Sequence, residues 1–255
     1  NQFGYDIRSL RLVGGGELPR TVVGTLMRID LPVALAPGQS VEFTIEWDFN
    51  IVEENAVYAR SGYEHFPDDP RPGGNDIFLM AQWFPRMVAY SDYEGWHNKE
   101  FLGRGEFTLE FGDYDVSITV PDDHIVSSTG VLQNPTQVLT TQQIQRLERA
   151  RTADAPVFIV TPQEAEANER SGASGTKTWR AYLSTSIEGR SAINAGDRIG
   201  SGPWYNFNEM LIARGVTDLH TNDSKLNKDM ALNELGDVVN GVGDSPNRHD
   251  ILTGT

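Results

Sequence analysis

The strongest constraint on the fold is the alternation of apolar and polar residues along several short segments. Between residues 41 and 51, apolar residues occupy every second position and polar residues lie between them. Residues 105–111 and 114–120 repeat the pattern on either side of Gly112-Asp113, a dipeptide typical of hairpin turns. Successive side chains of a strand point to opposite faces, so these segments predict strands with one buried and one solvated face. This favours an antiparallel sheet over a parallel α/β sheet, whose strands are apolar throughout.

The stretch from Ala81 to Pro121 holds the densest aromatic content of the chain. It predicts a central antiparallel hairpin whose inward side chains are Phe107, Leu109, Phe111, Tyr114, Val116, Ile118 and Val120. A lone hairpin is only marginally stable and cannot cover the apolar residues that precede it. We therefore expect a further layer to pack on Trp83, Phe84, Met87, Val88, Tyr90, Tyr93 and Trp96.

Other segments predict shorter elements. Residues 3–13 and 21–31 predict two strands joined by a glycine turn, and residues 157–160 predict a short buried strand. Thr140 and Gln143 have the spacing of a capping box and precede an apolar stripe, which predicts a helix of about three turns. Thr161-Pro162-Gln163-Glu164 has the same capping spacing, with proline at the first helical position, and predicts a second, weaker helix.

The composition narrows the classes of partner. The chain has 36 acidic and 21 basic residues, a net charge of −15, which repels nucleic acid and anionic lipid. No nucleic-acid partner is therefore expected. No apolar run reaches the ~18 residues of a membrane helix, so no transmembrane segment is expected either. The absence of cysteine excludes disulfides and thiolate chemistry, and it is compatible with a periplasmic or an extracellular protein.

A change in composition divides the chain. Residues 171–178 are small and polar, as in a linker, and beyond them long alternating runs give way to segments rich in Gly, Asn and Asp. We expect a β-domain over residues 1–170, a linker over 171–178 and a second domain over 179–255. The predicted fold class is mainly β, with one or two short helices in the first domain.

Distinctive segments of the first part carry a family resemblance. They are Gln82-Trp83-Phe84-Pro85-Arg86, Gly95-Trp96, and residues 35–40, 101–107 and 156–162. From residue 1 to about Trp179, the chain resembles the N-terminal β-domain of bacterial M1-type zinc aminopeptidases. The resemblance implies an antiparallel, β-sandwich-like domain that supports and shapes the substrate site of a metallopeptidase.

The zinc chemistry of that family is not expected in this chain. Such an enzyme holds zinc with a His-Glu-x-x-His motif and a distant glutamate. This sequence lacks the motif, and none of its five histidines are paired at helical spacing. We expect no cofactor here, and zinc only with a separate catalytic domain. The resemblance implies a substrate-facing role for Gln82, because the family's N-domain lends a Gln or Glu to the bound amine; the alternative is a polar residue at the start of a strand.

The last part carries a second resemblance, in residues 179–186, 197–206 and 247–254. These segments resemble a bacterial C-type-lectin-like module with endostatin-like features, which implies an α+β segment. The flanking parts of that family are missing, so the module is partial. The triplets associated with calcium-dependent sugar binding are also missing. Trp204 and Tyr205 are candidate ligand-binding residues that could stack on a sugar ring, although core packing is an equal alternative.

Together these features favour a non-catalytic binding or structural protein. A protein or peptide partner is expected, and a glycan is a second candidate. One alternative is an extracytoplasmic accessory subunit of a larger complex that docks through the lectin-like segment. Another is a fragment of an active zinc aminopeptidase whose catalytic domain lies outside this chain. Because both resemblances are partial and meet near Trp179, we also interpret the chain as a composite, either a fusion or a sequence assembled from separate pieces.

Overall fold

The protein is represented by a computed structural model, and the description is confined to part of the chain. The described residues are 3–53, 56, 62–67, 74–81, 83–100, 112–128, 130–150, 152, 157–184 and 209–213. Strands predominate over helices, and every strand pair that these residues form is antiparallel. The predicted mainly β, antiparallel class is therefore confirmed at this level. No described helix combines the length and the apolar character needed to cross a membrane.

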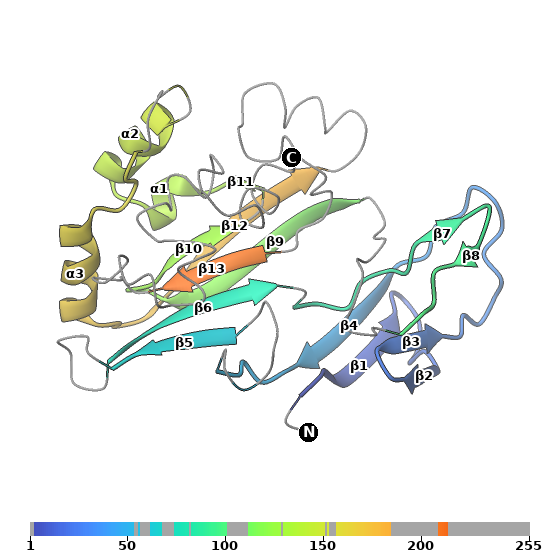
Figure 1. Ribbon diagram of the computed structural model, residues 1–255. Coiled ribbons are helices and arrows are strands. Elements are labelled where there is room, and N and C mark those ends of the chain that lie inside the picture. Colours follow the sequence, from blue (N-terminus) through green and yellow to red (C-terminus); the bar gives the residue numbers. More distant parts are fainter. Residues whose placement is uncertain are drawn as a thin grey trace. The chain divides into compact units, whose positions relative to one another are not determined.

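The chain divides into two compact units. The first unit comprises Asn1–Ile51 and Met87–Thr108, and the second comprises Val52–Arg86 and Leu109–Thr255. The first unit is built from three two-stranded sheets, which Figure 1 labels by strand. These strands are β1 (Asp6–Leu12), β2 (Arg20–Val23), β3 (Leu26–Ile29), β4 (Phe43–Asp48), β7 (Tyr90–Ser91) and β8 (Gly95–Trp96), paired as β1–β4, β2–β3 and β7–β8.

The core of the first unit is small. Strand β4 keeps the predicted alternation, and its residue Ile45 lies opposite Leu10 of β1. Leu10 and Leu18 are buried, and the backbone N–H of Leu18 donates to the Leu10 carbonyl at 2.9 Å. The inward residues of β4 itself are only partly buried. Within the described residues, no second apolar layer closes the core of this sheet.

The single strand predicted for residues 21–31 is wrong, because the chain reverses there into the β2–β3 hairpin. Gly24 lies at the turn with φ +55°, in the left-handed region that glycine adopts without strain. The carboxylate of Glu100, beyond β8, lies directly against Gly24 and occupies the space of a side chain there. A larger residue at position 24 would therefore strain the backbone and would require the Glu100 side chain to move.

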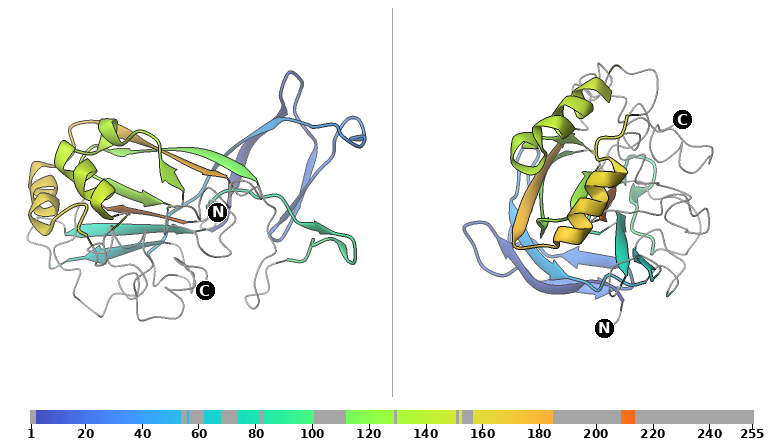
Figure 2. Two further views of the ribbon diagram at one scale, coloured as in Figure 1. Left: turned by 90° about the horizontal axis from the view of Figure 1, so that it is seen from above. Right: turned by 90° about the vertical axis from the view of Figure 1, so that its left-hand side faces the viewer.

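The second unit contains two larger sheets and all the described helices. One sheet has the strand order β10-β13-β6-β5 and the other has the order β11-β12-β9. The strands are β5 (Gly62–Phe66), β6 (Asn75–Ala81), β9 (Asp113–Pro121), β10 (Ile125–Ser128), β11 (Val131–Leu132), β12 (Thr176–Ser184) and β13 (Glu209–Ala213). The helices are α1 (Pro135–Val138), α2 (Thr141–Ala150) and α3 (Pro162–Ser171), which Figures 1 and 2 show on one side of this unit.

Strand β9 confirms the inward face predicted for residues 114–120. Ile118 and Val120 are buried, and the polar residues that alternate with the inward positions along β9 are exposed. Along its full length β9 pairs with β12, and Ile118 lies opposite the buried Trp179. The other half of the predicted hairpin, with Phe107, Leu109 and Phe111, lies outside the described residues.

The expected linker and domain boundary fall at the start of β12. Helix α3 ends at Ser171 and β12 begins at Thr176, so residues 172–175 form the connection. Asp122 of the β9–β10 turn fastens this connection, because its two carboxylate oxygens accept bonds from the N–H and the hydroxyl of Ser174, both at 2.9 Å. These bonds lower the pKa of Asp122. Farther along, β13 lies between β10 and β6, so the chain beyond Trp179 contributes strands to both sheets.

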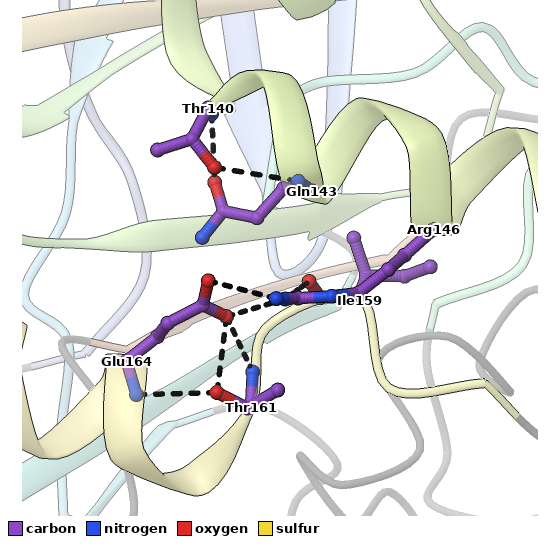
Figure 3. A network of polar contacts seen from close by, with 6 residues as sticks. All are labelled: Thr140, Gln143, Arg146, Ile159, Thr161 and Glu164. Atoms are coloured by element: carbon purple, nitrogen blue, oxygen red, sulfur yellow. Dashed lines mark hydrogen bonds and ion pairs between the residues drawn. The ribbon is translucent and has the colours of Figure 1, made fainter.

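Both predicted capping boxes are present. Gln143 and Thr140 exchange side-chain-to-backbone bonds of 3.3 and 2.9 Å, and Glu164 and Thr161 exchange bonds of 3.3 and 2.8 Å. Figure 3 shows how Arg146 of α2 joins the second box, donating to both carboxylate oxygens of Glu164. Arg146 also donates to the carbonyl of Ile159 at 2.9 Å. Arg146 therefore links α2 to the N-terminal cap of α3 in one polar network.

Val157, Ile159 and Val160 are buried and Phe158 is exposed, so the burial predicted for residues 157–160 is confirmed for three of the four, but the predicted strand is wrong. Val157 and Ile159 pack against Ala150 and Leu147 of α2, and no strand pairing is formed there. Arg146 takes the Ile159 carbonyl, which a sheet would otherwise use. The segment therefore packs apolar side chains on α2 instead of joining a sheet.

Candidate functional site

The three residues singled out from the sequence, Gln82, Trp204 and Tyr205, lie outside the described residues. A site must therefore be sought elsewhere. Within the ranges that the structure describes, no group of three His, Cys, Asp or Glu side chains could hold a metal ion.

Exposed apolar side chains are concentrated in the first unit. Of the large apolar residues that are exposed in the described ranges, all but Phe158 and Tyr182 belong to it. Of the buried apolar residues, by contrast, only Leu10, Leu18 and Ala89 do. Soluble proteins rarely expose large contiguous apolar patches unless these contact a partner or ligand. The first unit is therefore where a binding surface is to be expected.

The densest group of these exposed residues is on the β7–β8 hairpin. Tyr90 pairs with Trp96 and Ser91 pairs with Gly95 across the two strands. Gly95 has φ +79°, so the chain leaves the turn through a left-handed residue that glycine supplies. The N–H of His97 donates to the carbonyl of Ala89 at 2.9 Å and extends the pairing. The hairpin thereby holds its aromatic residues on a defined backbone.

The aromatic residues of this hairpin are open to solvent. Met87, Tyr90, Tyr93 and Trp96 are exposed by 58%, 60%, 80% and 56%. The expectation that a further layer covers them is therefore wrong for these four residues. The rings of Tyr90 and Trp96 meet edge to face, with centroids 5.1 Å apart and planes at 75°. Tyr93 meets the ring of His97 in the same manner at 5.8 Å. We call Tyr90, Tyr93 and Trp96 the aromatic hairpin surface.

A polar network beneath this surface fixes the turn. The Ser91 hydroxyl lies 2.8 Å from His97 Nε2 and accepts a 3.3 Å bond from the N–H of Glu94. Lys99 donates to Glu94 at 2.6 Å, at the opposite side of that carboxylate from His97. The bond between Lys99 and Glu94 lowers the pKa of Glu94 and raises the pKa of Lys99. These contacts join β7 and the turn to each other and to the residues that follow β8.

Ser91, His97 and Glu94 are the residue types of a hydrolytic triad, but their geometry favours a structural role. The distance between His97 Nδ1 and the nearer Glu94 oxygen is 3.9 Å, too long for the hydrogen bond that orients a catalytic imidazole. The Ser91 hydroxyl already serves as an acceptor for the turn backbone. The network is therefore best understood as the support of the aromatic hairpin surface.

The charged residues of this hairpin and of the segment that follows it are mainly acidic. Asp92 and Glu94 lie on the turn itself and Glu100 follows β8, whereas Lys99 is the one ammonium between residues 87 and 100. Both Asp92 and Glu100 are exposed. An exposed aromatic surface near acidic residues is suited to binding, because the rings offer area for stacking and the carboxylates attract cations.

The sequence shows these aromatic residues as a group but does not show that they form an exposed surface. The turn was also readable, since Asp92-Tyr93-Glu94-Gly95 combines turn-forming residues with flanking aromatics. Apolar content alone does not say which side of a hairpin is covered, and this was the information that the structure supplied.

Comparisons with protein-family models, with curated proteins and with solved structures find no match for this chain. The aromatic hairpin surface is therefore interpreted from its own geometry.

Proposed function

We propose that this protein is a non-catalytic binding and structural protein whose aromatic hairpin surface contacts a protein or peptide partner. The proposal is carried by one observation, the exposure of Tyr90, Tyr93 and Trp96 on a hairpin that a polar network holds in place. Large rigid aromatic residues are enriched where proteins bind partners, since they bury much area at low entropic cost.

The resemblances noted in the sequence suggest a setting for this activity. In our proposal, the first part of the chain is a β-sandwich-like domain similar to the N-terminal domain of M1-type aminopeptidases, and the last part is a partial lectin-like segment. The protein acts in the periplasm or outside the cell, as an accessory component of a larger assembly. A zinc-dependent catalytic domain, where the full-length protein has one, lies outside these residues.

Binding to an array of short immobilised peptides of varied composition tests this proposal. The wild-type protein is expected to bind a subset of the peptides, and the double variant Tyr93→Ser/Trp96→Ser is expected to lose that binding. Tyr182→Ser is the matched control, because Tyr182 is an exposed aromatic residue of the second unit. Equal binding by the wild type and the double variant would show that the hairpin is not the contact surface.

A further inference from the structure

The aromatic hairpin surface has the chemistry to select one kind of partner. We propose that it binds basic peptide segments, and that arginine or lysine side chains of the partner stack on Tyr93 and Trp96. This inference rests on the proposed binding function and adds to it the chemical class of the partner.

The first argument comes from the ring geometry. Because the rings of Tyr90 and Trp96 meet edge to face, they do not cover each other's π-faces as stacked rings would. Both residues are also more than half exposed. The π-face of an aromatic ring attracts a cation, most strongly in Trp. Tyr93, which is 80% exposed at the tip of the turn, adds a second ring within the same hairpin.

The second argument comes from charge. Asp92 and Glu94 lie on the turn that carries Tyr93, and Lys99, the single ammonium between residues 87 and 100, is already paired with Glu94. The whole chain carries a net charge of −15. A basic segment gains from both the local and the overall field, whereas an acidic segment, an anionic membrane or a second copy of this chain is repelled.

The second unit shows that this chain accommodates such contacts. The ammonium of Lys177 lies 5.2 Å from the ring centroid of Trp179, and the guanidinium of Arg86 lies 5.9 Å from that of Phe84. Both distances are in the range of a cation–π contact. Among the described residues, no cation makes such a contact with Tyr93 or Trp96. The partner would supply the cation there.

Fluorescence anisotropy with short labelled peptides tests the inference on the full chain. The peptides are alternating arginine and glycine, the same sequence with neutral citrulline in place of arginine, the same with glutamate, and a neutral leucine- and tyrosine-rich peptide. The arginine peptide is expected to bind most tightly and to weaken as salt is raised from low ionic strength to about 0.15 M, because salt screens exposed charges.

The variants separate stacking from general attraction. Tyr93→Leu and Trp96→Leu are each expected to weaken binding of the arginine peptide by ~3- to 10-fold, the loss of one exposed to partly desolvated cation–π contact. Asp92→Asn should weaken it more than Asp6→Asn, which removes an exposed carboxylate of the first unit outside this hairpin. Tyr182→Leu is expected to bind like the wild type. Near-ultraviolet circular dichroism checks that each variant is folded, and Tyr93→Leu keeps the test open if Trp96→Leu disrupts the hairpin.

Four outcomes would overturn the inference. One is equal affinity for the arginine and citrulline peptides, and another is arginine-peptide binding that neither hairpin variant changes. The third is hairpin-dependent binding of the leucine- and tyrosine-rich peptide with none of the arginine peptide, which would leave the proposed binding function standing and remove only the basic partner. Failure of every peptide to bind would contradict both proposals.

Discussion

Replacing Glu164 with alanine removes the residue on which the polar network between α2 and α3 depends. Its carboxylate accepts from Arg146 at 2.5 and 3.1 Å and from the N–H and hydroxyl of Thr161 at 2.8 and 3.1 Å. The side chains of Arg146 and Glu164 are only 21% and 28% exposed, so solvent cannot fully replace these bonds. The substitution therefore removes half of a capping box and leaves a partly buried guanidinium without its counter-ion.

The expected cost follows from these contacts. The loss of a helix N-cap interaction costs about 1 kcal/mol, and a hydrogen bond to a charged group contributes about 1.5 to 3 kcal/mol. The bonds share one carboxylate and are not additive, and Arg146 keeps the Ile159 carbonyl as a partner. We expect Glu164→Ala to lower the stability of the second unit by roughly 2 to 4 kcal/mol, and Glu164→Gln, which keeps an acceptor oxygen, by roughly 1 to 2 kcal/mol.

Native-state hydrogen exchange is the suitable assay, because peptides from α3 report on the second unit alone. Glu166→Gln is the matched control on the same helix. Glu166 pairs with Arg170 at 3.2 Å, but these side chains are 45% and 67% exposed, so the substitution should change stability by no more than ~0.5 kcal/mol. An equal effect of Glu166→Gln and Glu164→Ala would refute the argument, as would a loss below ~0.5 kcal/mol for the alanine variant.

The pH dependence gives an independent check. Burial raises the pKa of Glu164, but the bonds from Arg146 and Thr161 outweigh it and leave the pKa below its ordinary value of 4.5. A carboxyl group whose pKa is lower in the folded state adds stability above its unfolded pKa, and this is lost as the pH falls through the folded pKa. The stability difference between the wild type and Glu164→Gln should therefore be constant near neutral pH and shrink below about pH 4.5.

Two further predictions concern the first unit and the absent metal chemistry. Leu10→Ala should lower the free energy of unfolding in urea by ~2 to 5 kcal/mol, because Leu10 is fully buried in a small core. The control Val33→Ala, at a side chain that is 76% exposed, should change it by less than ~0.5 kcal/mol. Similar losses for both variants would contradict the assigned core. The purified chain should neither hold stoichiometric zinc nor hydrolyse aminoacyl amides, and metal analysis that found one tightly bound zinc per chain would refute this expectation.

The sequence predicted local structure well, because local structure depends on spacing. Alternation identified the buried face of β9, and the Thr-x-x-Gln and Thr-x-x-Glu spacings located the starts of α2 and α3. The sequence could not predict which strands pair, because a period of two specifies which face of a strand is apolar but not which strand lies beside it. Strand β9 pairs with β12, which begins 55 residues after β9 ends, and the residue pattern of neither strand predicts this pairing.

The candidate site shows the same limit. The aromatic content of residues 83–96 was evident, but its exposure depends on whether another element covers it, and that is a tertiary property. Similarly, residues 157–160 have the composition of a strand, yet Arg146 bonds the Ile159 carbonyl and the segment packs on α2. In both places the outcome depended on tertiary contacts, made or not made, which the spacing of residues does not specify.

Strand β12 bears directly on the division of the chain, because it continues through the expected boundary. Lys177 precedes that boundary, and Trp179 and Ala181 follow it, yet all three lie on one face opposite Val120, Ile118 and Val116 of β9. Trp179 and Ala181 are 4% and 3% exposed. A protein truncated after Thr178 would therefore lose buried side chains and the β12 backbone that pairs with residues 113–118 of β9. We expect such a truncation to abolish cooperative unfolding of the second unit, since a bare strand edge and an uncovered apolar face would result. A truncated protein that unfolds as cooperatively as the full chain would instead support a self-contained domain that ends before Trp179.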